Sequence, residues 1–281
     1  MSCFQPQLAQ FQGRSFQQMV DQLGVTLEEP EFWIEEKLDG ERMQLHMDED
    51  ENGQKRFAFW SRKGKDYTYL YGHSFDDEKS ALTRHIREAF DPGVRNIILD
   101  GEMITWDPDS GTMVPFGTLK TAALMEQKDG YGKGMRPLLR VFDCLFVNDQ
   151  DITRYELRER HKALDRFITD VHERLEKLHV DKAKSVDEIE GYLRKVVARG
   201  SEGLVLKNPR SMYQLNSRNN DWMKVKPEYM TEFGENLDCL IIGGYYGSGH
   251  RGGRLSSFLC GLRVDSHIQQ SQGRNFEVVE I

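Results

Sequence analysis

The chain has 281 residues and is acidic, with 46 Asp and Glu against 38 Lys and Arg and a formal net charge of −8 at pH 7. This length allows one large domain followed by a small one. The negative balance argues against a protein that wraps nucleic acid through its overall charge. A nucleic-acid contact would need a local basic face or another part of the protein.

The four cysteines, Cys3, Cys144, Cys239 and Cys260, are scattered, and the eight histidines follow no zinc-ligand spacing. We therefore expect reduced thiols and no zinc site. The sequence contains neither a signal peptide nor an apolar run long enough to cross a bilayer. We expect a soluble intracellular protein without membrane contact.

In chain order, the first half consists mostly of predicted strands. Apolar patterns predict strands over 32–38, 42–47, 55–61, 96–106 and 137–147, and helical spacing predicts a helix over 78–90 that ends at Asp91-Pro92-Gly93. Asp100 and Glu102 interrupt the fourth strand around Gly101, and Asp143 is the single acid in the fifth. Gly101 indicates either a tight turn beside a ligand or a bulge.

Two helices are predicted in the second half. The first is a long, charged, amphipathic helix over 153–179. The second covers 186–199, begins with a capping box of Ser185 and Glu188, and ends at Gly200. Both have the pattern that is typical of scaffold helices.

The last part of the chain changes character. Strands are predicted over 203–207 and 222–226 and, after Pro227, in a buried strand with a glycine-rich loop over 238–253 and a strand over 256–264. We expect residues 1–230 to form one domain and residues 231–281 to be the truncated beginning of a second. The chain would then be a fragment of a larger protein.

The stretch Lys37-Leu38-Asp39-Gly40-Glu41-Arg42 places a lysine and an arginine at the two ends of a turn. Alone, it could be an ordinary exposed turn. Charged groups also stand at the strands of residues 61–64, 100–102, 202–207 and 222–226. Because burying an unpaired charge is costly, we expect these groups to converge on each other or on a ligand. The cations suit a polyphosphate, and Glu102 and Glu202 suit a divalent cation or a ribose hydroxyl.

The ordered motifs KLDGER, SRKG, LDGEM, VFDCLFVN, EGLVLK and WMKVK resemble the nucleotidyltransferase motifs of ATP-dependent DNA ligases. Within that family the chain is most similar to the eukaryotic ligase IV group of non-homologous end joining, as KPEYM (226–230) and IIGGYYGSGHRGG also indicate. The likeness weakens over 107–136 and beyond Val264. It implies an α+β nucleotidyltransferase fold, ATP-grasp-like, of antiparallel sheets flanked by helices, with the start of a small OB-like β segment.

The resemblance assigns roles to individual residues. Lys37 would attack the α-phosphate of ATP and form a lysyl-AMP intermediate. Arg62 would bind the 5′-phosphate of nicked DNA, and Glu102 and Glu202 would hold Mg²⁺, with Glu102 alternatively at the ribose hydroxyl. The other implied nucleotide-binding residues are Glu35, Glu36 and Leu38 at the adenine edge, Phe142 on adenine, Arg42 at the ribose and phosphate, Lys207, and Lys224 and Lys226 at the phosphates. By its pattern alone, Phe142 could equally be a core residue.

A lysine nucleophile must be neutral, whereas a free lysine is almost entirely protonated near neutral pH. We expect nearby cations, together with bound Mg²⁺, to favour the neutral form of Lys37. These cations are Arg42, Lys207, Lys224 and Lys226. Glu36 should point to the opposite side of the strand, so it does not oppose this effect.

Some parts of the family pattern are missing. Phe116 stands where the ligase IV group carries a lysine near the nucleotide, and Lys120 is close by in sequence. The last basic motif, the helical DNA-binding domain and the BRCT repeats that bind a coiled-coil partner are not found in the sequence. We therefore expect a monomeric fragment that performs mainly the first step, from a nuclear protein that acts on nicked or broken double-stranded DNA.

Two alternatives stay open. An mRNA-capping guanylyltransferase shares the lysine motif but uses GTP, so labelling with ATP and GTP separately distinguishes the two. A non-catalytic nucleotide-binding module would keep the pocket without forming a covalent adduct, although every charged position of the motif series is filled.

Overall fold

The computed structural model describes residues 3–11, 15–26, 28–114, 117–129, 134–227, 239–246, 252–253, 255–263 and 276–280. The chain divides into two compact units, Met1–Thr231 and Glu232–Ile281. Phe116 and residues 228–230 of the KPEYM motif lie outside the described residues.

One sheet of the first unit contains the strand that ends at Lys37. Its order is β1 (Leu8–Phe11), β12 (Arg218–Val225), β11 (Gly203–Lys207), β2 (Phe32–Lys37) and β10 (Val180–Ala183). β1 and β12 run parallel, and the other neighbouring pairs run antiparallel. In this register Gly203 lies opposite Lys37, and Val205 lies opposite Lys224. The pairing therefore joins motifs that are far apart in the sequence.

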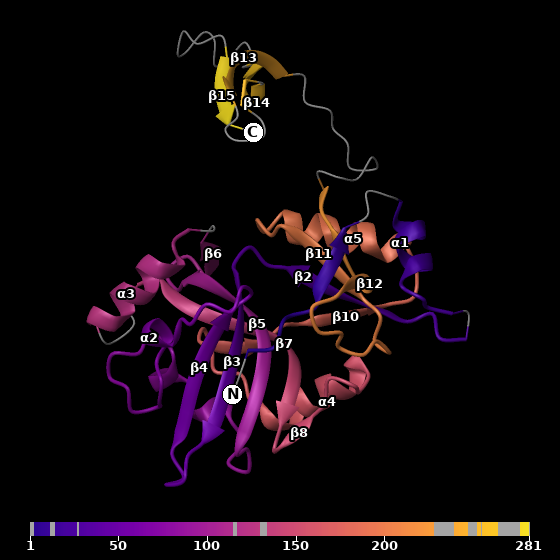
Figure 1. Ribbon diagram of the computed structural model, residues 1–281. Helices are drawn as coiled ribbons and strands as arrows, with labels where there is room; N and C mark the ends of the chain where they lie inside the picture. The colour runs from indigo at the N-terminus through magenta and orange to yellow at the C-terminus, as the bar shows by residue number, and fades with distance from the viewer. Residues whose placement is uncertain are drawn as a thin grey trace. The chain divides into compact units, whose positions relative to one another are not determined.

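The second sheet lies beside the first in the same unit (Figure 1). Its order is β4 (Lys55–Ser61), β3 (Glu41–Glu49), β5 (Asn96–Asp107), β7 (Arg136–Val147) and β8 (Gln150–Asp151), with β6 (Thr112–Val114) beside β5 and β9 (Leu175–Lys177) beside β7. Met43, Leu45 and Leu99 belong to a large hydrophobic cluster on one face. Arg42 and Glu102 each stand one residue from a member of this cluster, Met43 and Met103, and are directed to the other face.

Helices cover both sheets. α2 (Thr68–Tyr71), α3 (Leu119–Asp129) and α4 (Leu157–Phe167) pack against the second sheet, and α1 (Phe16–Gln22) and α5 (Asp187–Val197) pack against the first. The expected α+β architecture of antiparallel sheets flanked by helices is confirmed. The strands predicted in the first unit are also confirmed, with ends that differ by a few residues.

The helix predicted over 78–90 is wrong. This segment forms two short 3-10 turns, η1 (Thr83–His85) and η2 (Arg87–Ala89). Residues 80–83 are all fully buried, which a helix with a single buried face does not allow. The Thr83 hydroxyl also donates a hydrogen bond of 2.6 Å to the Ser74 carbonyl. Contacts with the rest of the fold therefore override the helical spacing.

The long helix predicted over 153–179 is also wrong. α4 ends at Phe167, and the Ile168 N–H donates to the Leu164 carbonyl at 2.9 Å. The chain then turns, and β9 pairs in parallel with β7. Ile168 and Leu175 are buried in the same cluster as Leu164, so the sequence pattern was correct about burial and wrong about conformation. Pairing with β7 satisfies the backbone of β9, which local spacing does not reveal.

The helix predicted over 186–199 is confirmed as α5. The Glu188 carboxylate accepts a hydrogen bond of 3.0 Å from the Ser185 N–H, which is one of the two bonds of the predicted capping box. The Ser185 hydroxyl accepts from the Asp187 N–H at 3.3 Å. Gly200 follows the helix with a φ angle of 83°, a conformation that glycine adopts without strain.

The second unit contains three antiparallel strands in the order β13 (Cys239–Tyr246), β14 (Leu255–Arg263) and β15 (Phe276–Glu280). The burial expected for the first of these strands is wrong, because Leu240, Ile241 and Tyr246 are exposed. Three strands have no second layer among the described residues of this unit, so apolar side chains stay uncovered. No helix in the described ranges is long and apolar enough to cross a membrane.

Asp143, the single acid in the 137–147 strand, is fully buried and forms an ion pair with Arg160 of α4. Two hydrogen bonds of 2.8 Å join the guanidinium to the carboxylate. Arg160 also donates to the Tyr155 and Ser211 carbonyls. The pair therefore attaches α4 to β7 and to the segment after β11.

We predict that Asp143→Ala lowers the free energy of unfolding by about 3–5 kcal/mol, because it leaves the Arg160 guanidinium buried without its counter-ion. Urea unfolding followed by tryptophan fluorescence measures this change, since all four tryptophans lie in the first unit. Glu190→Ala, which breaks an exposed pair with Arg194, is the matched control and should cost less than about 1 kcal/mol. Equal losses in the two variants would refute the prediction.

Candidate active site

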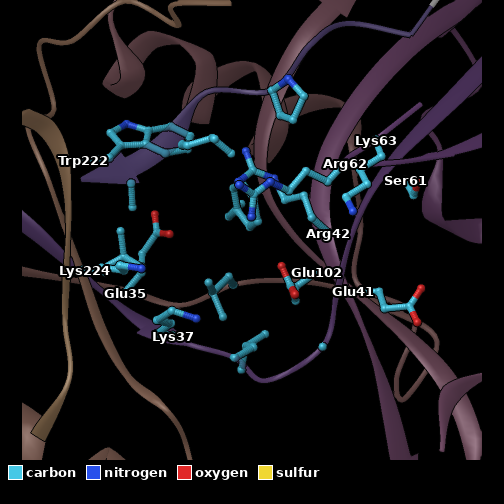
Figure 2. A pocket seen from close by; sticks show the side chains of 18 of the residues that line it. Glu35, Lys37, Glu41, Arg42, Ser61, Arg62, Lys63, Glu102, Trp222 and Lys224 are labelled. Carbon is cyan, nitrogen blue, oxygen red and sulfur yellow. The ribbon is translucent and has the colours of Figure 1, made fainter. Parts of the chain in front are cut away.

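A cavity of about 1310 Å³ in the first unit is lined by strands of both sheets (Figure 2). Its wall includes the end of β2, the turn into β3, the end of β4, and the segment before β1, together with parts of β5, β7, β11 and β12. The face of the second sheet that points away from the hydrophobic cluster contributes Arg42 and Glu102. Strand alternation thus separates core residues from charged cavity residues.

Lys37 ends β2 in the cavity wall, where its ammonium group forms an ion pair with Glu202. The Glu202 N–H also donates to the Lys37 carbonyl at 3.2 Å, so the backbone holds the two residues together. The other carboxylate oxygen of Glu202 pairs with Lys226. Burial opposes ionisation of Glu202, but hydrogen bonds from Lys226 and Lys37 lower its pKa below the ordinary value.

The surroundings of Lys37 differ from the predicted ring of cations. Its direct ionic partner is the Glu202 carboxylate, which the resemblance assigned to a metal ion. Cations do lie nearby: burial and the positive charges of Arg218 and Lys226 lower the pKa of Lys224. This part of the site is therefore a cationic cluster with a carboxylate inside it.

Lys207 and Glu35 form a second ion pair, with 2.6 Å between Nζ and Oε2 and both side chains 2% exposed. Lys207 Nζ lies 4.5 Å from the centre of the Phe142 ring and 4.1 Å from that of Trp222. The other oxygen of Glu35, Oε1, is buried and has no hydrogen-bond partner in the described part of the chain. It is an acceptor beside the cavity that a ligand could satisfy.

Phe142 belongs to a hydrophobic cluster and also lines the cavity. Its ring packs edge-on against Trp222, with 6.1 Å between ring centres, in a small hydrophobic cluster. The same side chain lines the cavity, and Arg42 Cζ lies 4.7 Å from its centre. Phe142 is therefore a core residue with one side available to the cavity.

Arg42 is held by Asp100, which is fully buried on β5. Nε donates to Oδ1 at 2.8 Å, and Nη2 donates to Oδ2 at 2.7 Å. Nη2 also donates to the Gln7 carbonyl at 3.1 Å. Of the two acids around Gly101, Asp100 is thus the partner of an arginine, and Glu102 is the one that lines the cavity.

Glu102 lies opposite Arg42 in the β3–β5 register. Burial raises the pKa of Glu102 from 4.5 to about 7, against the lowering effect of Arg42 and Lys37. This carboxyl is therefore partly protonated near neutral pH. No group of three or more His, Cys, Asp and Glu side chains within the described ranges could hold a metal ion. A metal ion at Glu102 or Glu202 would take further oxygen atoms from a ligand or water.

The remaining predicted residues also belong to this region. Glu36 accepts a hydrogen bond from the Ser201 hydroxyl. Leu38 is buried, and Arg62 is exposed after the end of β4. Each predicted site residue lines the cavity except Lys226, which reaches it through its ion pair.

The parts of the cavity wall that sequence reasoning missed include Arg218, Trp222 and residues between 3 and 9. Arg218, Trp222 and Lys224 are separated by even numbers of residues along β12 and so lie on one face of the strand, a signal that could have identified the first two. The segment before β1 has no comparable motif. It reaches the cavity because β1 pairs with β12 and because two hydrogen bonds, of 2.8 and 3.2 Å, join its backbone to the Gln44 side chain.

Gly101 was expected to mark either a tight turn beside a ligand or a bulge, and Gly40 stands in the turn between Lys37 and Arg42. A Cβ atom on Gly40 would lie 2.4 Å from the Met103 carbonyl oxygen. On Gly101 it would lie 2.6 Å from the Arg140 carbonyl oxygen. The β5–β7 register shifts between Asp100 and Gly101, so the bulge is the correct interpretation there. The close approach of a neighbouring strand, β5 at Gly40 and β7 at Gly101, is the reason for glycine at both positions.

Comparison with known proteins identifies the family. Residues 6–226 match a family described as the ATP dependent DNA ligase domain. The chain belongs to the ATP-dependent DNA ligase family. It is 65% identical over 280 residues to DNA ligase 4 of Neurospora crassa, which is 99% of this ligase chain and 27% of the relative. It is 64% identical over 276 residues to DNA ligase 4 of Coccidioides immitis, or 97% and 28% of the two chains.

The predicted similarity to the ligase IV group is confirmed. The chain spans about a quarter of the length of these relatives, 27% and 28%.

Solved structures of DNA ligases share its fold. A mycobacterial DNA ligase D complexed with ATP and MES has a TM-score of 0.52 at 20% identity, over 93% of this chain and 68% of that one. A Lig E DNA ligase has a TM-score of 0.52 at 16% identity, over 98% and 90%. The nucleotidyltransferase fold is confirmed.

We predict that Glu102 makes this ligase chain lose stability as the pH rises from about 4.5 to about 7. Burial raises the pKa of Glu102, so the folded state binds more protons than the unfolded state in this window and loses free energy of unfolding as the proton leaves. Glu102→Gln removes the titration. Its stability relative to the wild type should therefore be greater at about pH 8 than at about pH 5.

Urea unfolding at a series of pH values measures this difference. Glu88→Gln, at an exposed glutamate, is the control and should follow the wild-type pH dependence. A difference between Glu102→Gln and the wild type that stays constant across the series would show the prediction to be wrong.

Proposed function

We propose that this chain is the catalytic adenylation core of an ATP-dependent DNA ligase of the ligase IV type. The Lys37 nitrogen attacks the α-phosphate of ATP, a P–N bond forms, the amine loses its proton, and the P–O bond to pyrophosphate breaks. The observation that carries the proposal is the place of Lys37, at a strand end in the wall of a cavity of about 1310 Å³ among other cations. A cavity of this volume admits a nucleoside triphosphate.

The cations supply the charge that a triphosphate requires. We place Lys224 and Lys226 at the phosphates and Arg42 at the ribose and phosphate side. Their positive charges would also favour the neutral Lys37 amine and stabilise the charge on the transferring phosphoryl group. Glu202 keeps Lys37 and Lys226 together at this wall.

The nucleobase would lie against Phe142, with Glu35, Glu36 and Leu38 at its edge. The unpartnered Oε1 of Glu35 supports a base that presents a donor there. Adenine carries an amino group at carbon 6, whereas guanine carries an acceptor oxygen at that position. Lys207 supports this arrangement because it holds the other oxygen of Glu35.

Mg²⁺ would be held by Glu102 and Glu202, whose oxygen atoms are the donor type that this ion takes, together with phosphate oxygens and water. A cation beside Glu102 would offset the burial that raises the pKa of this carboxyl. When bound, the ion would neutralise phosphate charge. Without it, the protonated Glu102 could meet the ribose hydroxyl.

In the whole protein, AMP would pass from Lys37 to the 5′-phosphate of a DNA break, held by Arg62, and a 3′-hydroxyl would displace it. This chain would perform mainly the first step, as a monomer. Its similarity to DNA ligase 4 proteins supports an enzyme of double-strand break repair by non-homologous end joining. We extend this to a nuclear protein that binds a coiled-coil partner through BRCT repeats outside this sequence.

The domain organisation is part of the proposal. Residues 1–230 would be the nucleotidyltransferase domain, and residues 231–281 would begin an OB-fold domain. The guanylyltransferase and the non-catalytic module are not favoured, because residues 6–226 match a DNA ligase family.

We predict that incubation with ATP and Mg²⁺ adds one AMP to the intact mass of the chain, on Lys37, and that pyrophosphate removes it. GTP should add nothing. Lys37→Arg should form no adduct, because a guanidinium is a poor nucleophile, although it still offers Glu202 a cation. Mass spectrometry of the intact chain and its peptides measures these results.

Lys162→Ala is the matched control, since Lys162 is an exposed lysine of α4, and it should be labelled like the wild type. An adduct from GTP alone, or an adduct on Lys37→Arg, would overturn the proposed function.

A further inference from the structure

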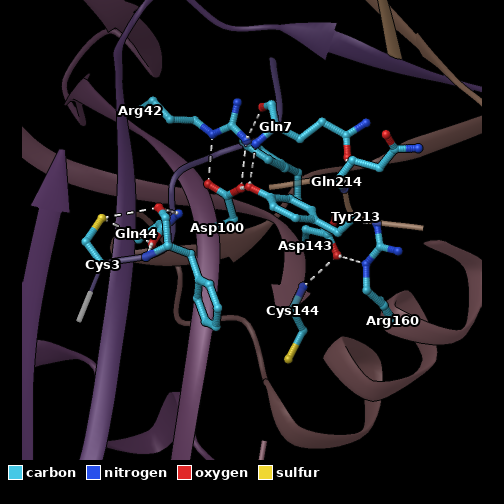
Figure 3. Close-up of polar contacts among 12 residues, drawn as sticks. Cys3, Gln7, Arg42, Gln44, Asp100, Asp143, Cys144, Arg160, Tyr213 and Gln214 are labelled. Carbon is cyan, nitrogen blue, oxygen red and sulfur yellow. Dashed lines mark hydrogen bonds and ion pairs between the residues drawn. The ribbon is translucent and has the colours of Figure 1, made fainter. Parts of the chain in front are cut away.

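We propose that Tyr213 is a positioning residue that sets the orientation of Arg42 in the cavity through the buried carboxylate of Asp100. This inference rests on the proposed function, because Arg42 is one of the groups placed there at the nucleotide. It is based on a closed ring of four hydrogen-bonded residues, Arg42, Asp100, Tyr213 and Gln7 (Figure 3).

The ring joins four separate segments of the chain: β3, β5, the segment before β1 and the segment between β11 and β12. Arg42 donates to both oxygens of Asp100, at 2.8 and 2.7 Å. The Tyr213 hydroxyl donates to Asp100 Oδ2 at 2.6 Å and accepts from the Gln7 N–H at 3.1 Å. The Gln7 carbonyl completes the ring by accepting from Arg42 Nη2 at 3.1 Å.

The protonation states fix the direction of these bonds. Burial, and then the charge of Asp100, raise the pKa of Tyr213 well above its ordinary value, so the phenol keeps its proton and donates it. Burial opposes the charge of Arg42, but Asp100 raises its pKa above the ordinary value, so the guanidinium stays charged. Each polar group of the ring therefore acts as the donor or acceptor described.

Arg42 keeps one nitrogen for a ligand. Nε and Nη2 are engaged by the ring, whereas Nη1 makes no hydrogen bond with the part of the chain that the structure describes. The side chain is 15% exposed and lines the cavity, with its Cζ 4.7 Å from the Phe142 ring centre. A guanidinium is planar, so the direction of Nη1 follows from the plane of the carboxylate that holds the other two nitrogens.

Tyr213 controls that plane because its hydroxyl and Arg42 share Asp100 Oδ2. Without the hydroxyl, Asp100 would be held by Arg42 alone, and the pair could rotate together. Gln7 adds a second support: its side chain is fully buried and accepts from the Gln214 N–H at 2.7 Å. Through the hydrogen bonds of Gln7, the orientation of Arg42 therefore depends on where the segment before β1 lies.

Tyr213→Phe tests the inference, because it removes the hydroxyl and keeps the aromatic side chain, which packs against Trp222 with 5.7 Å between the centres of the two aromatic rings. We expect the rate of lysyl-AMP formation, measured by intact mass in a single turnover at limiting ATP, to fall about tenfold. Arg42→Ala should also lower the rate, and adding Tyr213→Phe to it should cause no further loss. A tyrosine that acted only on the stability of the fold would lower the rate in both backgrounds.

Tyr155→Phe is the matched control, because it removes the hydroxyl of a tyrosine that is 46% exposed and lies outside the cavity, and it should keep the wild-type rate. A wild-type rate for Tyr213→Phe, or a full additional loss in the Arg42→Ala background, would overturn the inference alone. A wild-type chain that forms no adduct with ATP would overturn the proposed function, and this inference with it.

Discussion

The ion pair between Arg42 and Asp100 is the interaction on which the charged wall of the cavity depends. Removing a carboxylate and a guanidinium from water costs several kcal/mol for each ion, and good geometry with additional hydrogen bonds is needed to offset that cost. Asp100 is fully buried and obtains its partners from β3 and from Tyr213. The charges are therefore balanced only when these segments are all in place, which ties the assembly of the fold to the shape of the site.

The cost of burying a charge without a partner also accounts for the pairing of the other charged residues of the cavity. Lys207 is paired with Glu35 where both are almost completely buried, and Glu202 is shared by Lys37 and Lys226 where all three are partly exposed. The buried pair belongs to the wall and supports the aromatic rings above it. The partly exposed group is the one that a ligand can reach, and phosphates would bring its lysines more negative charge than a single carboxylate supplies.

The alternation of side chains along a strand decides which residues pack in the core and which face the cavity. Along β3 and β5, one face contributes Met43, Leu45 and Leu99 to the hydrophobic cluster, and the other presents charged side chains to the cavity. A shift of one residue in register would exchange the two faces, so the packing of the core also specifies which charges reach the site. The bulge at Gly101 adjusts this register beside Asp100 and Glu102.

The sequence by itself determined the strands of the first unit, because a period of two residues is a local signal. It indicated the family through the resemblance of its ordered motifs. Charges inside apolar strands are also local signals, and they indicated many of the charged side chains that line the cavity. The sequence did not determine the conformation of 78–90 or of 168–179, where contacts with distant segments replace helical hydrogen bonds. Only the tertiary structure decided which charged and polar groups are paired: Glu202 lies 165 residues from Lys37, and Tyr213 lies 113 residues from Asp100. The first pair forms when β2 and β11 pair within one sheet, and the second forms when the two sheets meet. Burial requires each of these polar groups to find a partner, and no local pattern in the sequence records which partner that is.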